Sequence, residues 1–278
     1  MKSTLSLASR CQLAAARTAS SIAAFALALS GCGGSDDDGT TAARPEDAGP
    51  VRFLSTSYNF RSNQLLLLMS FEGGLTYGFY QADFTRPSYE YAHDGMFVVR
   101  RLPGARSSDP TIGLDHDFQN GTTRPATLAL AAPNEVGIAL GALTTVTAGP
   151  PANTTVTEPI GAWESDNASL DTNPMTVSGT YAAQGRSVNA SLKFRARIEN
   201  GRLTATAADG CAMEATLQPR PKGNVYDVKA IFGPGCPIAA GTFKGHALQA
   251  YAADNVFLLL ESTTQGGVML LLGSRQVP

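Results

Sequence analysis

The sequence lacks the short motifs by which many catalytic and nucleotide-binding sites are recognised. It contains no Gly-x-Ser-x-Gly elbow, no His-Glu-x-x-His pair, no P-loop and no dinucleotide-binding glycine pattern. Its only histidines are His93, His116 and His246, and its scattered carboxylates single out no acid and base pair. We therefore predict that the chain is not an enzyme, although a hydrolase triad of Ser, His and Asp assembled from distant residues stays open.

Charge of either sign is also scarce. Charged residues make up 16% of the 278 residues, and the net charge is −2. Residues 1–31 carry a charge of +3 and residues 33–50 carry −4, so the chain from Val51 onward is close to neutral, at −1. Nucleic-acid binding needs a basic face, and we predict no nucleic-acid partner.

Long hydrophobic runs are missing as well. The uncharged apolar stretch at residues 18–29 has 12 residues, which is too short to cross about 30 Å of hydrocarbon as a helix. It follows Lys2, Arg10 and Arg17 and precedes small residues. This arrangement is typical of the hydrophobic region of a signal peptide, which we place at residues 1–31.

The residues that end this stretch, Leu29-Ser30-Gly31-Cys32, resemble the lipobox of bacterial lipoproteins. The resemblance implies cleavage before Cys32, a diacylglyceryl thioether on its sulfur and acylation (for example palmitate) of the new amino terminus. The alternative is an ordinary signal peptide cleaved near the same point. In enteric bacteria an Asp after the lipidated Cys favours the inner membrane. Gly33 at this position therefore implies the outer membrane, with a periplasmic or surface-facing body left open.

Residues 32–50 contain the expected lipidated Cys and a polar, acidic segment. From Gly33 to Pro50 there is no large apolar residue, and five acids oppose one arginine. Such a segment cannot bury enough surface to offset its ordering entropy. We therefore predict a disordered tether, with the acidic run serving as a solvated spacer rather than a cation site.

The rest of the chain has the composition of an all-β protein. The full sequence holds 28 glycines and 16 prolines, most of them after residue 50, which suit many chain reversals. Continuous apolar runs at residues 64–71 and 255–261 predict strands that are covered on both faces. The break at residues 148–158 is either a domain boundary or a long loop, and we place an N-terminal β domain at 51–158 and a C-terminal β domain at 159–278.

The C-terminal half has the clearest alternation. Between Ser187 and Ile198, apolar and polar residues alternate for six cycles, and Asn200-Gly201 follows as a hairpin turn. We predict an antiparallel meander that closes into a small barrel or folds as a sandwich. The similar segments around Gly73-Gly74 and Gly266-Gly267 indicate either a duplicated domain or two unrelated buried hairpins.

Two of the four cysteines are expected in the mature body. Cys11 leaves with the signal peptide and Cys32 carries lipid, which leaves Cys211 and Cys236 beside glycine turns. In an oxidising compartment such a pair predicts a disulfide, whose loop closure contributes roughly 3 kcal/mol to stability.

A metal site is not expected. Asp115-His116-Asp117 is the most metal-like triplet, but neighbouring side chains of a strand point to opposite faces, so the three cannot share one ion there. We predict no metal and no cofactor.

Gly161-Ala162-Trp163 resembles the Gly-x-Trp of lipocalins, and Arg275 stands near the chain end, where lipocalins often place an arginine over that tryptophan. This resemblance implies a ligand cavity in a C-terminal barrel. More broadly, the lipobox, the tether, Gly179-Thr180-Tyr181, Gly210-Cys211 and Gly235-Cys236 resemble a group of uncharacterised proteobacterial lipoproteins. The group has no established activity, so it implies location and β fold only.

The sequence therefore predicts a lipid-anchored envelope protein whose β body is a non-catalytic interaction module. Its partners would be the membrane, through Cys32, and an envelope protein. The alternative is a lipocalin-like barrel that binds a small apolar ligand.

Overall fold

The computed structural model describes residues 51–56, 65–81, 94–132, 134–135, 138–149, 152–164, 172–173, 176–238, 241–249, 255–263 and 267–276. The chain divides into two compact units, Met1–Ala42 and Ala43–Pro278, and all described residues belong to the second. Cys32, the predicted tether and His93 lie outside the described residues.

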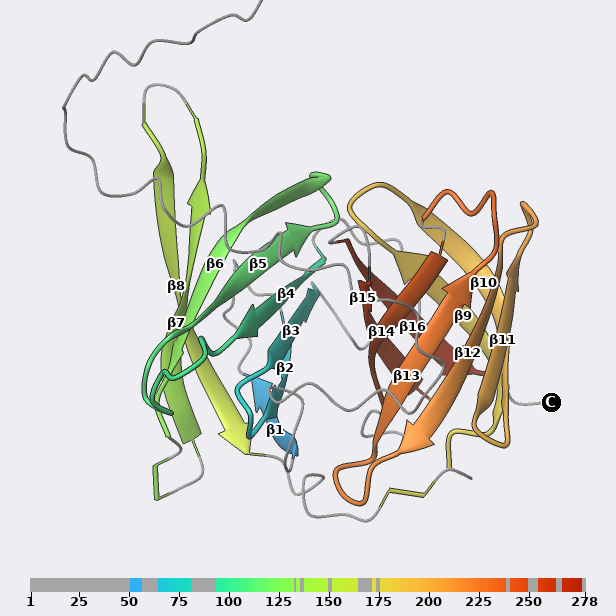
Figure 1. Cartoon of the computed structure of the whole chain (residues 1–278), viewed down its shortest axis with the longest axis horizontal. Helices are drawn as coiled ribbons and strands as arrows, with labels where there is room; N and C mark the ends of the chain where they lie inside the picture. Colours follow the sequence, from blue (N-terminus) through green and yellow to red (C-terminus); the bar gives the residue numbers. More distant parts are fainter. Residues whose placement is uncertain are drawn as a thin grey trace, which may run out of the picture. The chain divides into compact units, whose positions relative to one another are not determined.

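The described residues form sixteen antiparallel strands and no α-helix, which confirms the predicted all-β class (Figure 1). The strands make two closed barrels of eight, each a meander in which consecutive strands pair. The first barrel consists of β1 (Val51–Thr56), β2 (Leu65–Phe71), β3 (Thr76–Gln81), β4 (Gly95–Arg100), β5 (Thr111–Asp117), β6 (Thr122–Leu130), β7 (Ile138–Thr147) and β8 (Thr154–Glu164). The second consists of β9 (Gly179–Arg186), β10 (Ser191–Glu199), β11 (Arg202–Ala207), β12 (Ala212–Pro219), β13 (Val225–Phe232), β14 (Gly241–Gln249), β15 (Asn255–Ser262) and β16 (Val268–Arg275).

Each barrel closes by pairing its first strand with its last. In the first barrel, β1 pairs with the end of β8, where Ser55 lies opposite Trp163. In the second barrel, β9 pairs with β16, where Ala183 lies opposite Gly273. Of the two predicted architectures, barrel and sandwich, the barrel is therefore the one observed.

The predicted domain boundary between residues 158 and 159 is wrong. It falls inside β8, and the break at residues 148–158 belongs to the hairpin that joins β7 to β8. Gly149, Pro150 and Pro151 favour a chain reversal, and a reversal within a domain carries the same signal as one between domains. The first barrel therefore extends to Glu164 and the second begins at Gly179.

Alternation and turn chemistry account for the second barrel. Along β10, exposed and buried side chains alternate, with Phe194, Ala196 and Ile198 facing inward. The β10–β11 turn places Asn200 at φ 51° and Gly201 at φ 73°, the left-handed pair that a two-residue hairpin requires. The predicted alternation started too early, because Ser187 donates its backbone N–H to the carbonyl of Ala190 and the chain turns there.

Three apolar cores hold the body together. One fills the first barrel, around Leu66, Leu68 and Phe97, and one fills the second, around Phe194 and Tyr226. The third lies between the barrels. Its members come from the outer faces of both, and include Met69, Phe71, Phe79, Met96, Phe257, Leu259 and Leu270.

This shared core explains the two continuous apolar runs. In β2, Leu66 and Leu68 face the barrel interior while Met69 and Phe71 face the other barrel. In β15, Leu258 and Leu260 point inward while Phe257 and Leu259 join the shared core. A strand covered on both faces has no position for an exposed polar residue, so alternation is lost. The similarity between the two hairpins thus reflects double burial: β2 is the second strand of its barrel and β15 is the seventh.

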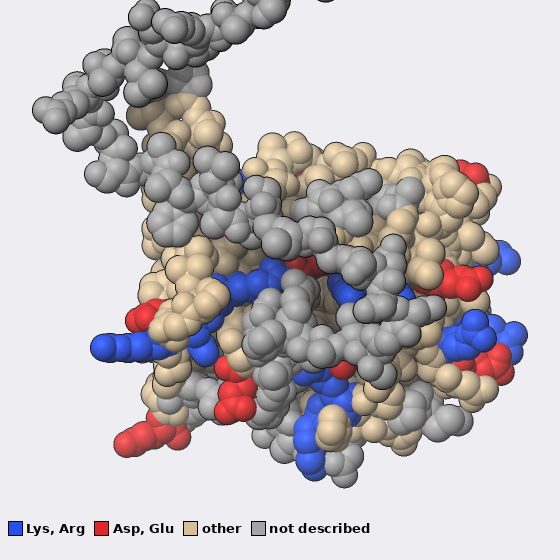
Figure 2. All heavy atoms as spheres, viewed as in Figure 1, with Lys and Arg blue, Asp and Glu red and all other residues tan. Residues whose placement is uncertain are grey.

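Most of the described surface visible in Figure 2 is uncharged, with basic and acidic side chains interspersed. No helix among the described residues is long and apolar enough to span a membrane.

Candidate functional site

The boundary between the barrels holds several partly buried charged groups, which makes it the first place to look for chemistry. Arg100 of β4 donates two hydrogen bonds to Glu261 of β15, at 2.5 and 2.6 Å. The Tyr77 hydroxyl donates to the same carboxylate at 2.8 Å. Glu261 is therefore bound by two residues of the first barrel, and this cluster joins the barrels by polar contacts at the edge of the shared apolar core.

A second ion pair crosses the same boundary. Asp94, directly before β4, lies 2.7 Å from the guanidinium of Arg186 in β9. Burial raises the pKa of Asp94 to about 6, against the lowering effect of the Arg186 charge. The other carboxylate oxygen of Asp94, Oδ1, has no hydrogen-bond partner among the described residues. The negative charge of the ionised carboxylate is therefore only partly compensated.

His246 combines with a carboxylate, as a catalytic histidine would. It lies opposite Asp227 in the β13–β14 pair, with Nδ1 3.1 Å from the Asp227 carboxylate. Burial alone would raise the pKa of Asp227, but the nearby His246 ring and the Arg220 guanidinium, which donates a hydrogen bond at 2.7 Å, lower it below its ordinary value.

The same histidine also contacts aromatic rings. The His246 ring lies 4.4 Å from the Phe71 ring and 5.6 Å from the Tyr77 ring, measured between centroids. The guanidinium carbon of Arg220 lies 4.6 Å from the centre of the Phe71 ring. No serine belongs to these contacts, so the described arrangement places no nucleophile beside the histidine.

The triplet Asp115-His116-Asp117 divides between two faces of β5. Asp115 is fully buried and accepts hydrogen bonds from Tyr80 at 3.0 Å and Arg124 at 2.9 Å. Asp117 accepts hydrogen bonds from the turn residue Asn120. Arg124 also lies 3.8 Å from the Asp117 carboxylate, so the two aspartates share this cation while His116 faces the other side of the strand.

His116 itself is buried and pairs through Nδ1 with the Thr123 hydroxyl at 3.0 Å. Burial lowers the pKa of His116 to about 4, although the negative charges of Asp115 and Glu261 oppose this shift. In the part of the chain that the structure describes, no three His, Cys, Asp or Glu residues are grouped to hold a metal ion.

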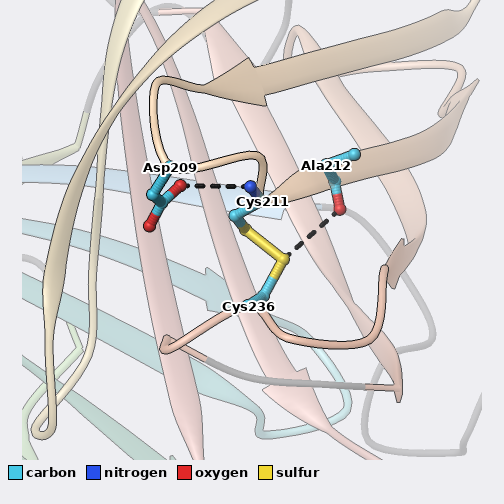
Figure 3. The surroundings of a disulfide bond; sticks show 4 residues. All are labelled: Asp209, Cys211, Ala212 and Cys236. Carbon is cyan, nitrogen blue, oxygen red and sulfur yellow. Dashed lines mark hydrogen bonds between the residues drawn. A yellow bond between two sulfur atoms is a disulfide. The ribbon is translucent and has the colours of Figure 1, made fainter.

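The predicted disulfide between Cys211 and Cys236 is present, with a Cα–Cα distance of 4.7 Å (Figure 3). It ties the start of β12 to the segment after β13. The Asp209 carboxylate accepts the backbone N–H of Cys211 at 3.1 Å and fixes the preceding turn. The Cys236 sulfur lies 3.6 Å from the Ala212 carbonyl oxygen, and because a bridged sulfur carries no proton we regard this as a packing contact.

The expected pairing of Trp163 with Arg275 is wrong. Trp163 lies in β8, the last strand of the first barrel, whereas Arg275 lies in β16, the last strand of the second. Arg275 instead donates hydrogen bonds to the Thr176 carbonyl and, at 3.2 Å, to the Tyr181 hydroxyl. Its guanidinium carbon lies 5.8 Å from the centre of the Tyr181 ring.

Tyr181 is therefore the aromatic residue that lies beside Arg275. It stands near the start of the first strand of its own barrel, and its hydroxyl donates to the Val177 carbonyl at 2.7 Å. The sequence carried a signal for this in Gly179-Thr180-Tyr181, which has the same spacing as Gly161-Ala162-Trp163.

Sequence reasoning missed the groups that join the barrels. Glu261 ends a strongly apolar run and Arg100 follows one. An ionisable residue at the end of a strand that is buried on both faces was therefore the sequence signal for these two groups. Asp94 and Arg186 carried no such signal. Comparison with known proteins adds no family: no protein-family model matches the chain, and no curated protein matches it significantly.

Proposed function

We propose that this chain is a lipid-anchored protein of the bacterial cell envelope, held in the outer membrane through Cys32. Its double-barrel body acts as a non-catalytic interaction module. The lipobox-like Leu29-Ser30-Gly31-Cys32 and the acidic segment that follows it supply the anchor and the spacer.

The observation that carries this proposal is the bonded pair Cys211–Cys236. Structural disulfides persist in oxidising compartments such as the periplasm and are rare where thiols are kept reduced. A signal peptide, an acylated cysteine and a disulfide in the body all belong to the same export route, so the fold supports the compartment that the N-terminus implies.

The engagement of the ionisable groups supports a role without catalysis. Glu261 and Asp94 have ion partners across the barrel boundary, and Asp115 is paired with Arg124 within the first barrel. His246 is packed against two aromatic rings beside its carboxylate. Each of these groups has a structural partner within a barrel or across the boundary, which accounts for its position without a catalytic role.

Binding of a small apolar ligand in the second barrel is the second candidate. An eight-stranded up-and-down barrel is the architecture of lipocalins, and Arg275 over Tyr181 forms the expected closing contact. Large inward-facing side chains count against it, because they pack into one contacting cluster around Phe194, Tyr226, Phe232 and Phe243. Saturable one-to-one binding of a fatty acid by the purified body would move this candidate to first place.

The proposal is tested by labelling cells with radioactive palmitate. The native chain should incorporate the label, and Cys32→Ala should abolish it while Cys11→Ala leaves it unchanged. Labelling that persists in Cys32→Ala, or that is absent from the native chain, contradicts lipidation at this site.

A further inference from the structure

The outer face of β10 carries three basic side chains in a row. Lys193, Arg195 and Arg197 are all exposed, because they alternate with the buried residues of the same strand. Every second residue of a strand points to the same side at a spacing of about 7 Å. We call these three residues the basic row.

The neighbouring strands do not neutralise the basic row. Its only ion pair among the described residues joins Arg197 to Glu199 at 2.9 Å, and both side chains are more than half exposed, at 65% and 60%. Such a pair screens little charge. The residues directly opposite the basic row are uncharged and mostly small: Gln184, Ala182 and Thr180 on β9, and Thr206 and Thr204 on β11.

Val51, the first described residue, lies at one end of the second barrel. Val51 lies against the β12–β13 turn, where a Cβ on Gly223 would be 3.3 Å from the Val51 Cβ. In an antiparallel meander, alternate turns lie at the same end, so the β10–β11 turn lies at this end too. Arg197 is close to that turn. The 18 residues between Cys32 and Val51 span at most about 60 Å.

We propose that the basic row docks on the phosphate-bearing lipid headgroups of the membrane that holds Cys32. This inference rests on the proposed lipid anchor and adds a second, electrostatic contact that orients the body. Charge complementarity carries it: three exposed cations among small neighbours can approach a flat anionic surface. The acyl chains proposed for Cys32 supply the anchor, and each basic residue close to an anionic membrane adds about 1 kcal/mol of attraction that orients the body.

The test uses the chain from Gly33 to Pro278, which keeps the whole compact unit but has no lipid. Co-sedimentation is measured with vesicles of phosphatidylcholine alone and with vesicles that also contain phosphatidylglycerol. The variant Lys193→Gln, Arg195→Gln, Arg197→Gln is compared with a control that loses the same charge elsewhere, Arg101→Gln, Arg106→Gln, Lys229→Gln. Circular dichroism verifies that both variants keep the β fold.

The native chain should bind only the anionic vesicles, and added salt should weaken the binding. At about fivefold per charge, the basic-row variant should bind about a hundredfold more weakly, and the control should bind within a few-fold of the native chain. Equal loss in both variants, equal binding to neutral vesicles, or binding to DNA without binding to vesicles overturns the proposal. Because this chain has no lipid, failure here leaves the palmitate result standing, and the reverse holds as well.

Discussion

Arg100 of the first barrel and Glu261 of the second form a two-bond ion pair at 2.5 and 2.6 Å, with Tyr77 donating to the same carboxylate. Their side chains are 27% and 16% exposed, so the pair is partly shielded from water. A charge left alone in such a place is costly, because its partner and part of its hydration are both missing. The pair therefore ties the stability of one barrel to that of the other.

Removing one partner should destabilise the body. We expect Arg100→Ala or Glu261→Ala to lower the free energy of unfolding by about 2–3 kcal/mol, measured by urea denaturation. A double-mutant cycle should give a coupling energy of at least about 1 kcal/mol. The exposed pair Arg197–Glu199 is the matched control, and Glu199→Ala should cost less than about 0.5 kcal/mol. Equal costs at the two pairs would contradict a shielded ion pair.

The shared apolar core predicts a large effect from truncation on an outer barrel face. Leu259 is 1% exposed although it points away from its own barrel, and Leu259→Ala should cost about 2–5 kcal/mol. Ile231, also outward-facing but 53% exposed, is the control, and Ile231→Ala should cost less than about 1 kcal/mol. Similar small costs in both variants would show that the barrels do not share a core in solution.

His116 should make the protein less stable in mild acid. Its folded pKa of about 4 lies below its ordinary value of 6.5, so the unfolded chain takes up a proton first as the pH falls. The stability it contributes is complete above pH 6.5 and is lost towards pH 4, on the order of 3 kcal/mol. The measurement is the pH dependence of urea unfolding, which should be shallower in His116→Asn. An NMR titration midpoint near 6.5 for His116 would refute this.

Asp94 should give a pH dependence of stability opposite to that of His116, with stability falling as the pH rises. Its folded pKa of about 6 lies above the ordinary 3.8, so the folded protein holds a proton that the unfolded chain has released. The stability from this group is present below pH 3.8 and is lost as the pH rises through 6. Relative to the native chain, Asp94→Asn should therefore gain stability between pH 4 and pH 7. A stability difference that stays constant over this range would contradict the raised pKa.

Much of the second barrel follows from sequence because its local signals agree. The alternation before Ile198, the Asn200-Gly201 turn and the glycine turns beside Cys211 and Cys236 each specify a neighbouring contact. Strand β8 was missed because residues 154–160 are exposed at most positions, so no buried face marks them as a strand. Trp163 was assigned to the wrong barrel for the same reason.

The joint between the barrels was not predictable from these patterns. The runs of β2 and β15 indicate burial on both faces, but an apolar pattern does not identify what covers each face. Arg100 and Glu261 are 161 positions apart and become neighbours only after both barrels have closed and packed. Likewise, a glycine two residues before an aromatic residue occurs at both Gly161–Trp163 and Gly179–Tyr181, and only the three-dimensional structure places Arg275 beside Tyr181.

The most direct test of the account is the intact mass of the protein purified from its native envelope, before and after reduction. The account predicts a chain that begins at Cys32, carries a diacylglyceryl group and an amide-linked acyl chain, and gains two hydrogens on reduction because Cys211 and Cys236 are bonded. An unmodified chain that begins elsewhere, or one in which both of these thiols are free, would contradict it.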